Sequence, residues 1–586
     1  MEGYLGTYRR MLLDMHITDA DPSFMTKYDP IALARLYERA NVGGVMLYTN
    51  SHVGLTYYPA SEGRMHPGIG GRDVVGELVD ALHKRDIKAC AYYSVLFDNW
   101  AVTEHPEWWT SPLRDPDASS TGGSGGSRSI PRYGVVCPSN EDYVKLTLAR
   151  ITELLDRYDF DCLFYDMTFW AAVCGCARCR DRYGADLPTR IDWTDPAWCR
   201  FQAAREDWMR SFVERIVDAA KLVAPGLRVY NNFALAVANW GPGFALDLAE
   251  LVDFCGGDMY GDRDEQLVVS KLMMNLTKNR PAEFMTSLCV NLRDHVGLRT
   301  ADDLAMKAFA ATAHGSATLF IDAIDPDGGV DAPRYEMVRE VFDRVASYEH
   351  LLGGEPVEDI AVYHSSESRM SFEENGRPVD RPGRGTPAHQ RALRGACRYL
   401  QRAHLPFGVI TRRQLDELDR YRVIVLPNVT RLDGDEVHAF REFVRRGGRL
   451  YASAWTSLLE VAGKLHYDFL LADVFGAVSD GVEAGSALYA KPVDDETAAS
   501  LSPQRYLSVM PRMRGMEVVG HVRAPSTRAT TGRPLATLTY PYGHPHPGSA
   551  IDRHWSSIHS WPPHLDTDRA VLVENVFGAG RCVYSA

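Results

Sequence analysis

An apolar run that ends in an acid gives the clearest chemical signal in this sequence. In FDCLFYDMTFW, residues 160–170, the run ends at Asp166, and an aromatic residue, Trp170, follows shortly after. Burying a carboxylate at a strand end costs free energy unless a partner or a reaction uses it. Glycoside hydrolysis uses such groups in pairs, because one attacks or stabilises the anomeric carbon while another protonates the leaving oxygen. Asp166 is therefore a candidate catalytic carboxylate, with Trp170 as an apolar platform for a sugar ring; the alternative is that Asp166 only caps a helix.

The second carboxylate of such a pair must come from elsewhere in the chain. Asp258, in the run GGDMYGD, is our first choice, because it ends another apolar run and an aromatic residue follows it. Glu283 lies at the start of a run, toward the other end of a strand, while Asp322 and Asp14 end runs of their own. The acid needs a raised pKa, which an apolar or carboxylate-rich environment supplies. A retaining mechanism also requires about 5–5.5 Å between the two carboxyl groups.

A cluster of cysteines forms the second strong signal. Cys174, Cys176 and Cys179 follow a C-x-C-x-x-C spacing, which suits thiolates on one tetrahedral zinc ion. This run lacks a fourth ligand, for which Cys137 in VVCPSNEDY and Cys199 are the candidates. Four thiolates would close the coordination shell and leave no position for a catalytic water. The alternative is reduced cysteines without a metal, since disulfides are disfavoured in a cytoplasm.

These residues need a scaffold that brings the ends of several strands together. Residues 9–345 alternate apolar runs with amphipathic helical patterns, and the runs are residues 9–16, 42–50, 87–94, 160–166, 227–232, 251–258, 282–287 and 317–322. Near-continuous apolar strands separated by helices indicate a parallel sheet that is covered on both faces. Eight of them predict a (β/α)₈ TIM barrel. A doubly wound open sheet is the alternative, although no G-x-G-x-x-G run follows the first strand.

Polar side chains gather where these predicted strands end, and a barrel places its chemistry at that edge. One polar residue at a strand end is often only a turn former, but a polar residue at nearly every end favours a binding site. Besides the catalytic candidates, the residues that we expect to contact substrate are Asp14, His16, Asn50, His52, Tyr93, Trp170, Asn232 and Asp322.

The pattern changes twice after the predicted barrel, residues 1–350. Residues 351–484 again alternate strands with helices and predict a small flavodoxin-like α/β domain, which has no phosphate-binding loop. In residues 485–586, short strands rich in Pro, Gly and Thr predict a small β-sandwich. We therefore expect three domains, with the catalytic candidates all in the first.

The predicted barrel resembles the α-L-fucosidases, a family of retaining glycosidases. The likeness is carried, in chain order, by Thr49–Gly54, Tyr92–Ser94 and Phe164–Trp170. The resemblance implies that Asp166 is the nucleophile and that His16, His52 and Trp170 bind the sugar. Two departures bear on sugar specificity: a Met-Thr pair follows Asp166 where the family has Gly-Gly, and His52 alone replaces a double histidine. The implied substrate is an α-L-fucoside, or a galactoside- or arabinoside-type sugar of related configuration.

The cysteine cluster and the second domain are similar to parts of the family 42 β-galactosidases. Those enzymes have a Cys-Pro pair upstream and a C-x-C-x-x-C run after the fourth strand, so the resemblance implies Cys137 as the fourth ligand of a structural zinc. The run ITRRQLDELDRYRVIVLPN, residues 410–428, looks like part of their trimerisation domain, whose fold packs subunits together. We therefore expect a homo-oligomer, with a monomeric spacer as the alternative.

Composition excludes several other classes of protein. A formal net charge of −13 argues against a nucleic-acid binder, and no apolar stretch is long enough to cross a membrane. The N-terminus lacks the pattern of a signal peptide, so we expect a cytoplasmic protein, without an organic cofactor. Our interpretation is a retaining exo-glycosidase. The alternatives are a non-catalytic carbohydrate-binding protein on an inactivated barrel and a zinc-dependent hydrolase that uses the cysteines.

Overall fold

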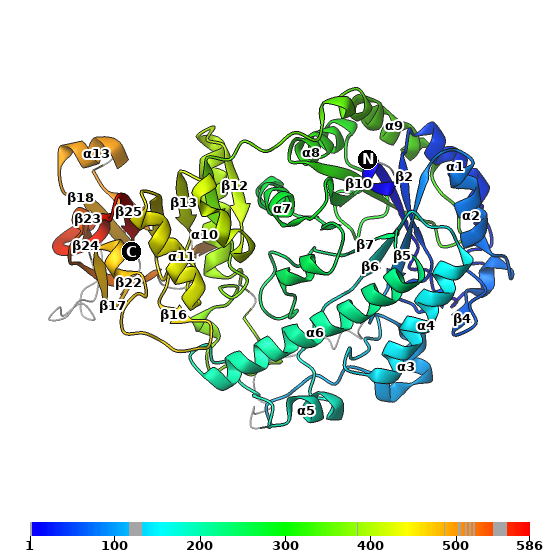
Figure 1. Cartoon of the computed structure of the whole chain (residues 1–586), viewed down its shortest axis with the longest axis horizontal. Coiled ribbons are helices and arrows are strands. Elements are labelled where there is room, and N and C mark those ends of the chain that lie inside the picture. The colour runs from blue at the N-terminus through cyan, green and yellow to red at the C-terminus, as the bar shows by residue number, and fades with distance from the viewer. Residues whose placement is uncertain are drawn as a thin grey trace. The chain divides into compact units, whose positions relative to one another are not determined.

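A computed structural model of the chain is shown in Figure 1. It describes residues 3–116, 132–383, 385–485, 487–501, 505–509, 512–514, 517–519, 522–542 and 560–586. The chain divides into two compact units. The first comprises residues 1–193, 197–356 and 371–386, and the second comprises residues 194–196, 357–370 and 387–586.

The first unit is built on a closed barrel of parallel strands. The strands are β1 (Arg9–Asp14), β2 (Gly44–Tyr48), β5 (Lys88–Ser94), β6 (Cys162–Asp166), β7 (Arg228–Asn231), β8 (Gly256–Asp258), β9 (Ala282–Ser287) and β10 (Ser316–Ala323). They pair in the order β7-β6-β5-β2-β1-β10-β9-β8, and a parallel bridge between Asn232 and Gly256 joins the first and last of these. Each strand overlaps one predicted run, so the TIM barrel is confirmed and the open-sheet alternative is wrong.

Helices follow the strands and surround the barrel (Figure 1). They are α1 (Pro30–Arg39), α2 (Val74–His83), α3 (Asn99–Glu104), α4 (Glu141–Arg157), α5 (Ala177–Tyr183), α6 (Pro196–Val223), α7 (Arg263–Leu276), α8 (Ala301–Ala313) and α9 (Ala332–Ala346). Capping side chains fix several starts: Asp29 accepts hydrogen bonds from the backbone N–H groups of Ile31 and Ala32, and Asn140 caps α4 in the same way. Across the described part of the chain, no helix has the length and apolar character that a membrane span needs.

A buried ion pair fills the N-terminal end of the barrel interior. Arg10 Nη1 lies 2.7 Å from Glu283 Oε2, and neither side chain is exposed. Tyr4 and Tyr230 also donate hydrogen bonds to Glu283, at 3.2 and 2.5 Å. Glu283 is therefore committed to the packing of this end, opposite the end where the polar strand termini gather.

The second unit contains the predicted α/β domain. Its parallel strands β11 (Ile360–Tyr363), β12 (Phe407–Ile410), β13 (Val423–Leu426) and β15 (Arg449–Ser453) pair in the order β12-β11-β13-β15. Helix α10 (Ala388–Arg402), the 3₁₀ segment Arg412–Arg420 and helix α11 (Gly434–Arg445) connect them. This alternation is the flavodoxin-like pattern that the sequence predicts.

The C-terminal strands form a sandwich-like pair of layers. They include β17 (Ala477–Gly485), β18 (Leu488–Pro492), β19 (Leu507–Val509), β22 (Val522–Ala529), β23 (Arg533–Pro541), β24 (Pro563–Phe577) and β25 (Gly580–Ser585), while β20 (Arg512–Arg514) and β21 (Glu517–Val519) form a separate hairpin. β17 pairs with β22, and a small core of Leu488, Val522, Leu538 and Tyr540 joins this pair to β18 and β23. The expected separation from the α/β domain is not found, because β25 lies between β15 and β24 in one nine-stranded sheet. In that place β25 covers the hydrogen-bonding edge of β15.

A segment between β11 and α10, residues 371–386, belongs to the first unit and crosses the boundary expected at residue 350. Asn375 accepts a hydrogen bond from the backbone N–H of Trp193, and Glu374 Oε2 accepts one from Trp240 Nε1 at 3.0 Å. Trp240 lies in the long connection after β7, so this segment supports the connection that begins at Asn232.

Candidate active site

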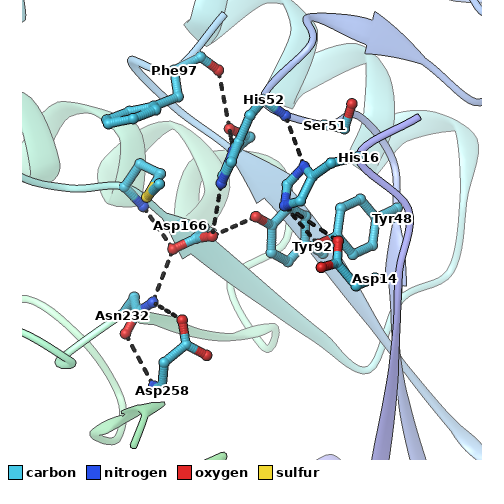
Figure 2. Close-up of polar contacts among 12 residues, drawn as sticks. Asp14, His16, Tyr48, Ser51, His52, Tyr92, Phe97, Asp166, Asn232 and Asp258 are labelled. Carbon is cyan, nitrogen blue, oxygen red and sulfur yellow. Dashed lines mark hydrogen bonds and ion pairs between the residues drawn. The ribbon is translucent and has the colours of Figure 1, made fainter. Parts of the chain in front are cut away.

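Asp166 is the last residue of β6, and its carboxylate lies where several barrel strands end (Figure 2). Only 6% of the residue is exposed. Its Oδ2 accepts a short hydrogen bond from Tyr92, and its Oδ1 accepts hydrogen bonds from the Met167 backbone N–H at 2.8 Å and from Asn232 Nδ2 at 2.9 Å. The next helix, α5, begins only at Ala177, so the alternative of a helix cap is wrong.

Asp258 ends β8, and a single amide group joins it to Asp166 (Figure 2). Asn232 Nδ2 is 2.9 Å from Asp166 Oδ1 and 3.0 Å from Asp258 Oδ2, so these two oxygens are at most about 5.9 Å apart. Burial and the charge of Asp166 raise the pKa of Asp258 to about 7, although hydrogen bonds with Asn232 and Tyr260 oppose the rise. At neutral pH this carboxyl group is therefore partly protonated, as a proton donor must be.

Two stacked histidines lie on the other side of Asp166. The ring centroids of His16 and His52 are 3.8 Å apart, and His52 Nε2 is 3.7 Å from Asp166 Oδ2. His52 Nδ1 is hydrogen-bonded to Ser94 Oγ at 2.7 Å, and Ser94 in turn donates to the carbonyl of Phe97. Burial lowers the pKa of both histidines below the usual value, which keeps them neutral at pH 7.

Asp14, at the end of β1, anchors the outer histidine. Its Oδ1 accepts a hydrogen bond from Tyr48 at 3.1 Å and lies 3.4 Å from His16 Nε2. The other ring nitrogen of His16 accepts the backbone N–H of His52 at 3.2 Å, so protein groups occupy both nitrogens of His16. The side chain of Asp14 remains 28% exposed and can therefore also accept a hydroxyl of a substrate.

Two predicted site residues point out of the barrel toward the helices. Tyr93 lies edge-on to Tyr165, whose hydroxyl donates to the carbonyl of Ile216 in α6. Asp322 forms an ion pair with Arg334 of α9 at 2.7 Å. Successive side chains of a strand point to opposite faces, so a shift of one residue moves a side chain out of the site.

Two other predicted residues serve the scaffold. Asn50 is fully engaged with the backbone of Ser94, with its amide nitrogen donating at 3.0 Å and its oxygen accepting at 2.8 Å. Trp170 is buried, and its indole N–H donates to the carbonyl of Arg205 in α6 at 2.9 Å. Neither side chain faces Asp166.

Several residues that the sequence analysis did not select take these places. Tyr92, rather than the predicted Tyr93, contacts the carboxylate of Asp166, and Phe169 is the partly exposed aromatic in the turn that follows Asp166. Its ring lies 5.7 Å from Phe97, whose ring lies 5.5 Å from that of His52. The alternation of side chains along a strand could have identified Tyr92, because residues 92 and 94 lie on the same face of β5 and Ser94 contacts His52.

The four predicted metal ligands form one cluster. All four sulfur atoms lie within 4.8 Å of one another, with 3.5 Å between Cys137 and Cys179 and 3.8 Å between Cys137 and Cys176. Tetrahedral zinc with bonds of about 2.3 Å needs sulfurs about 3.8 Å apart, whereas a disulfide needs about 2.0 Å. The cluster therefore fits a metal ion. Cys199 instead contacts the carbonyl of Trp193 at 3.6 Å.

The barrel, its carboxylate site and the sequence matches relate this chain to the glycoside hydrolases. A family model described as hypothetical glycosyl hydrolase 6 matches residues 29–167, and one described as β-galactosidase trimerisation domain matches residues 358–524. The chain is also similar to β-galactosidase BbgII of Bifidobacterium bifidum, with 26% identity over 268 residues. That alignment covers 41% of this chain and 37% of the relative.

Solved structures share the fold over nearly the whole chain. α-L-Fucosidase isoenzyme 2 from Paenibacillus thiaminolyticus has a TM-score of 0.73 at 18% identity, and the match covers 99% of this chain and 80% of that one. A β-galactosidase from Rahnella sp. R3 has a TM-score of 0.71 at 14% identity, over 100% of this chain and 87% of that one. At these identities the likeness shows the architecture alone.

Proposed function

We propose that this chain is a retaining exo-glycosidase, with Asp166 as the nucleophile and Asp258 as the acid and base. The observation that carries the proposal is that one amide nitrogen donates to both carboxylates, which keeps the two facing oxygens at most about 5.9 Å apart. Retaining enzymes have about 5–5.5 Å between the carboxyl groups, whereas inverting enzymes leave about 6.5–9.5 Å to admit a water.

The two steps follow from the positions of these groups. In the first step Asp166 attacks the anomeric carbon, and Asp258 donates its proton to the glycosidic oxygen as that bond breaks. In the second step Asp258 removes a proton from water, which attacks the same carbon and releases Asp166 from the glycosyl ester. The raised pKa of Asp258, about 7, supports this assignment, because the group must hold a proton first and then accept one.

The substrate is an α-L-fucoside or a galactoside- or arabinoside-type sugar of related configuration. The likeness to an α-L-fucosidase and to β-galactosidases supports this range. His52 and Asp14 are positioned to hold sugar hydroxyls, and Phe97 and Phe169 offer an apolar wall. Carboxylates, neutral histidines and tyrosines near the nucleophile suit an uncharged sugar.

We also propose a structural zinc ion at Cys137, Cys174, Cys176 and Cys179. These thiolates would join the segment before α4 to the segment that leads into α5. Because four thiolates complete a tetrahedron, they leave no open position for a catalytic water. That geometry argues against the alternative of a zinc-dependent hydrolase.

A homo-oligomer formed through the second domain is a further part of the proposal. It is supported by the match of residues 358–524 to a β-galactosidase trimerisation domain. The mass of the protein in solution, measured by light scattering during gel filtration, tests it. A mass that stays at 65.4 kDa at all concentrations would favour the monomeric spacer instead.

Hydrolysis of p-nitrophenyl glycosides tests the catalytic proposal. The α-L-fucoside, β-D-galactoside and α-L-arabinoside are assayed with the wild type and with Asp166→Ala. We expect the wild type to turn over one or two of them and the variant to lose about 10⁴-fold in kcat. Added azide should restore turnover by Asp166→Ala and yield a glycosyl azide of inverted configuration. Sugar binding without turnover would favour a non-catalytic carbohydrate-binding protein.

A further inference from the structure

The side chain of Asn232 uses its entire hydrogen-bonding capacity within the site. Its Oδ1 accepts the backbone N–H of Ala234 at 2.9 Å and that of Asp258 at 3.3 Å. Its Nδ2 then faces both carboxylates, at 2.9 Å from Asp166 Oδ1 and 3.0 Å from Asp258 Oδ2. An amide has two N–H donors and one oxygen with two lone pairs, so no donor or acceptor is left for a sugar.

The backbone fixes which way this amide points. Two N–H groups converge on Oδ1, which only the oxygen can satisfy, so the amide cannot be rotated by 180° without losing both bonds. Asn232 also forms the parallel bridge to Gly256 that closes the barrel between β7 and β8. Its side-chain amide is therefore anchored at the junction that closes the sheet, by the backbone N–H groups of Ala234 and Asp258.

Gly257 makes this close approach possible. A Cβ atom at position 257 would lie 2.6 Å from Asn232 Oδ1 and 2.7 Å from the backbone nitrogen of Ala234. Both distances are shorter than van der Waals contact, so any side chain here would push the amide away from Asp258. The absence of a side chain at Gly257 therefore lets Asn232 reach Asp258 across the β7–β8 junction.

We infer that Asn232 is a positioning residue, which sets the separation of the Asp166 and Asp258 carboxylates and donates one hydrogen bond to each. This inference rests on the proposed function. It differs from the sugar contact that the sequence predicts for Asn232, since the amide acts on the substrate only through the two acids.

The amide serves a different acid at each stage of the reaction. In the resting state Asp166 carries the negative charge and takes the stronger, charge-assisted hydrogen bond. When Asp166 becomes a neutral ester and Asp258 has given its proton to the leaving oxygen, the charge lies on Asp258, and the other N–H group of the amide stabilises it. Both bonds are in place beforehand, so no side chain has to move between the steps.

The test compares Asn232→Ala with the matched control Asn231→Ala. Asn231 is the adjacent residue, is fully buried where Asn232 is partly exposed, and donates to Thr168 Oγ1 at 3.1 Å. The measurement is the pH profile of kcat/KM, which reports the acid and the base of the free enzyme. The other titratable groups that face the two carboxylates are Tyr92, His52, His16, Tyr48, Tyr260 and Asp14, and both variants retain them.

We expect Asn232→Ala to move the alkaline limb of the profile, which reports Asp258, toward alkaline pH by about one pH unit, because Asp258 loses a donor that favours its charged form. We also expect kcat to fall about 10²-fold with little change in KM, because the two acids are no longer held in register. Asn231→Ala should leave both limbs in place. A rise in KM with unmoved limbs would overturn the inference and identify Asn232 as a sugar ligand.

A second variant and a second readout separate this inference from the proposed function. Gly257→Ala keeps every polar atom but displaces the amide, and should move the alkaline limb in the same direction as Asn232→Ala. Infrared difference spectra of ¹³C-aspartate-labelled protein, with Asp258→Asn as reference, follow the titration of Asp258 without turnover. An unmoved titration in Asn232→Ala would overturn the inference, whereas a wild type that hydrolyses no glycoside would contradict the proposed function alone.

Discussion

His52 Nε2 lies 3.7 Å from Asp166 Oδ2, and the hydrogen bonds of Ser94 assign the proton of the imidazole ring to its other nitrogen. Ser94 Oγ gives its own proton to the carbonyl of Phe97 at 3.1 Å, so it must accept one from His52 Nδ1 at 2.7 Å. Because burial holds the pKa of His52 well below its usual value, Nε2 carries a lone pair. A sugar hydroxyl held beside Asp166 can donate its proton to this lone pair.

His52→Phe tests this hydrogen bond to His52 Nε2, since phenylalanine keeps the ring shape but removes the acceptor. We expect kcat/KM to fall about 10²-fold on the best p-nitrophenyl glycoside, the loss that goes with one hydrogen bond beside a charged group. With the same glycoside lacking its 2-hydroxyl, the hydroxyl next to the anomeric carbon, His52→Phe should lower kcat/KM only slightly relative to the wild type. Equal losses on both substrates would mean that His52 acts only by packing.

The raised pKa of Asp258 predicts how activity depends on pH. A carboxyl group with a pKa of about 7 is protonated below that pH, so kcat/KM should fall as pH rises through it. The decline should reach about 10²-fold two pH units above the limb, because only the protonated fraction is active. In Asp258→Ala this limb should disappear, and added azide should give a glycosyl azide of retained configuration. An alkaline limb that persists in Asp258→Ala would assign the acid to another group.

Tyr92 and Tyr93 form a matched pair for testing which face of β5 points into the site. Tyr92→Phe removes the hydrogen bond to Asp166 Oδ2 and should lower kcat by about 10- to 100-fold with little change in stability. Tyr93→Phe lies on the helix-facing side and should leave kcat unchanged while lowering the free energy of unfolding by about 1 kcal/mol. Comparing kcat and urea midpoints for both variants checks the assignment, and the reverse pattern would contradict it.

The same pair shows what the sequence could and could not predict. Apolar runs located every barrel strand, because the core must be continuous, and the acids at two strand ends do lie together. The runs did not fix which of two neighbouring tyrosines points inward, because both Tyr92 and Tyr93 are buried and aromatic. Trp170 failed for a related reason: the turn after Asp166 sends Phe169 to the site and Trp170 to the core against α6.

The pairing of strands that lie far apart in the sequence could not be predicted either. The strand-like end of the chain was visible, but nothing local showed that β25 would pair in parallel with β15, more than a hundred residues earlier. The parallel register depends on a free strand edge in the α/β domain, which only the assembled sheet reveals.

The cysteine cluster predicts one zinc ion per chain and a stability that depends on it. Metal analysis of purified protein should find that ratio, and Cys176→Ser should lower both the zinc content and the melting temperature by several degrees, because metal binding is coupled to folding. Cys199→Ser is the matched control, since its sulfur contacts a carbonyl outside the cluster, and it should retain the metal. Zinc-free protein of undiminished stability would contradict a structural zinc.

His389 in the second unit predicts a loss of stability in mild acid. Its Nδ1 donates to the carbonyl of Pro427 at 2.8 Å, and its Nε2 accepts the backbone N–H of Ser365 at 3.1 Å. A second proton on Nε2 would face that N–H group, and burial lowers the pKa of His389 to about 4. An unfolded histidine takes up a proton near pH 6.5. Between about that pH and about 4, the unfolded chain therefore binds a proton at this histidine that the folded chain does not bind.

The contribution of His389 is therefore fully present above about pH 6.5 and is lost as the pH falls toward 4. At about pH 5 the loss should be about 2 kcal/mol relative to pH 7.5. Urea unfolding of wild type, His389→Asn and the control His438→Asn at these two pH values measures it. His438 is exposed on α11, so its variant should keep the wild-type pH dependence, whereas His389→Asn should be less stable at neutral pH but lose less in acid. An identical acid loss in His389→Asn and the wild type would assign the effect to other groups, such as the histidines beside Asp166.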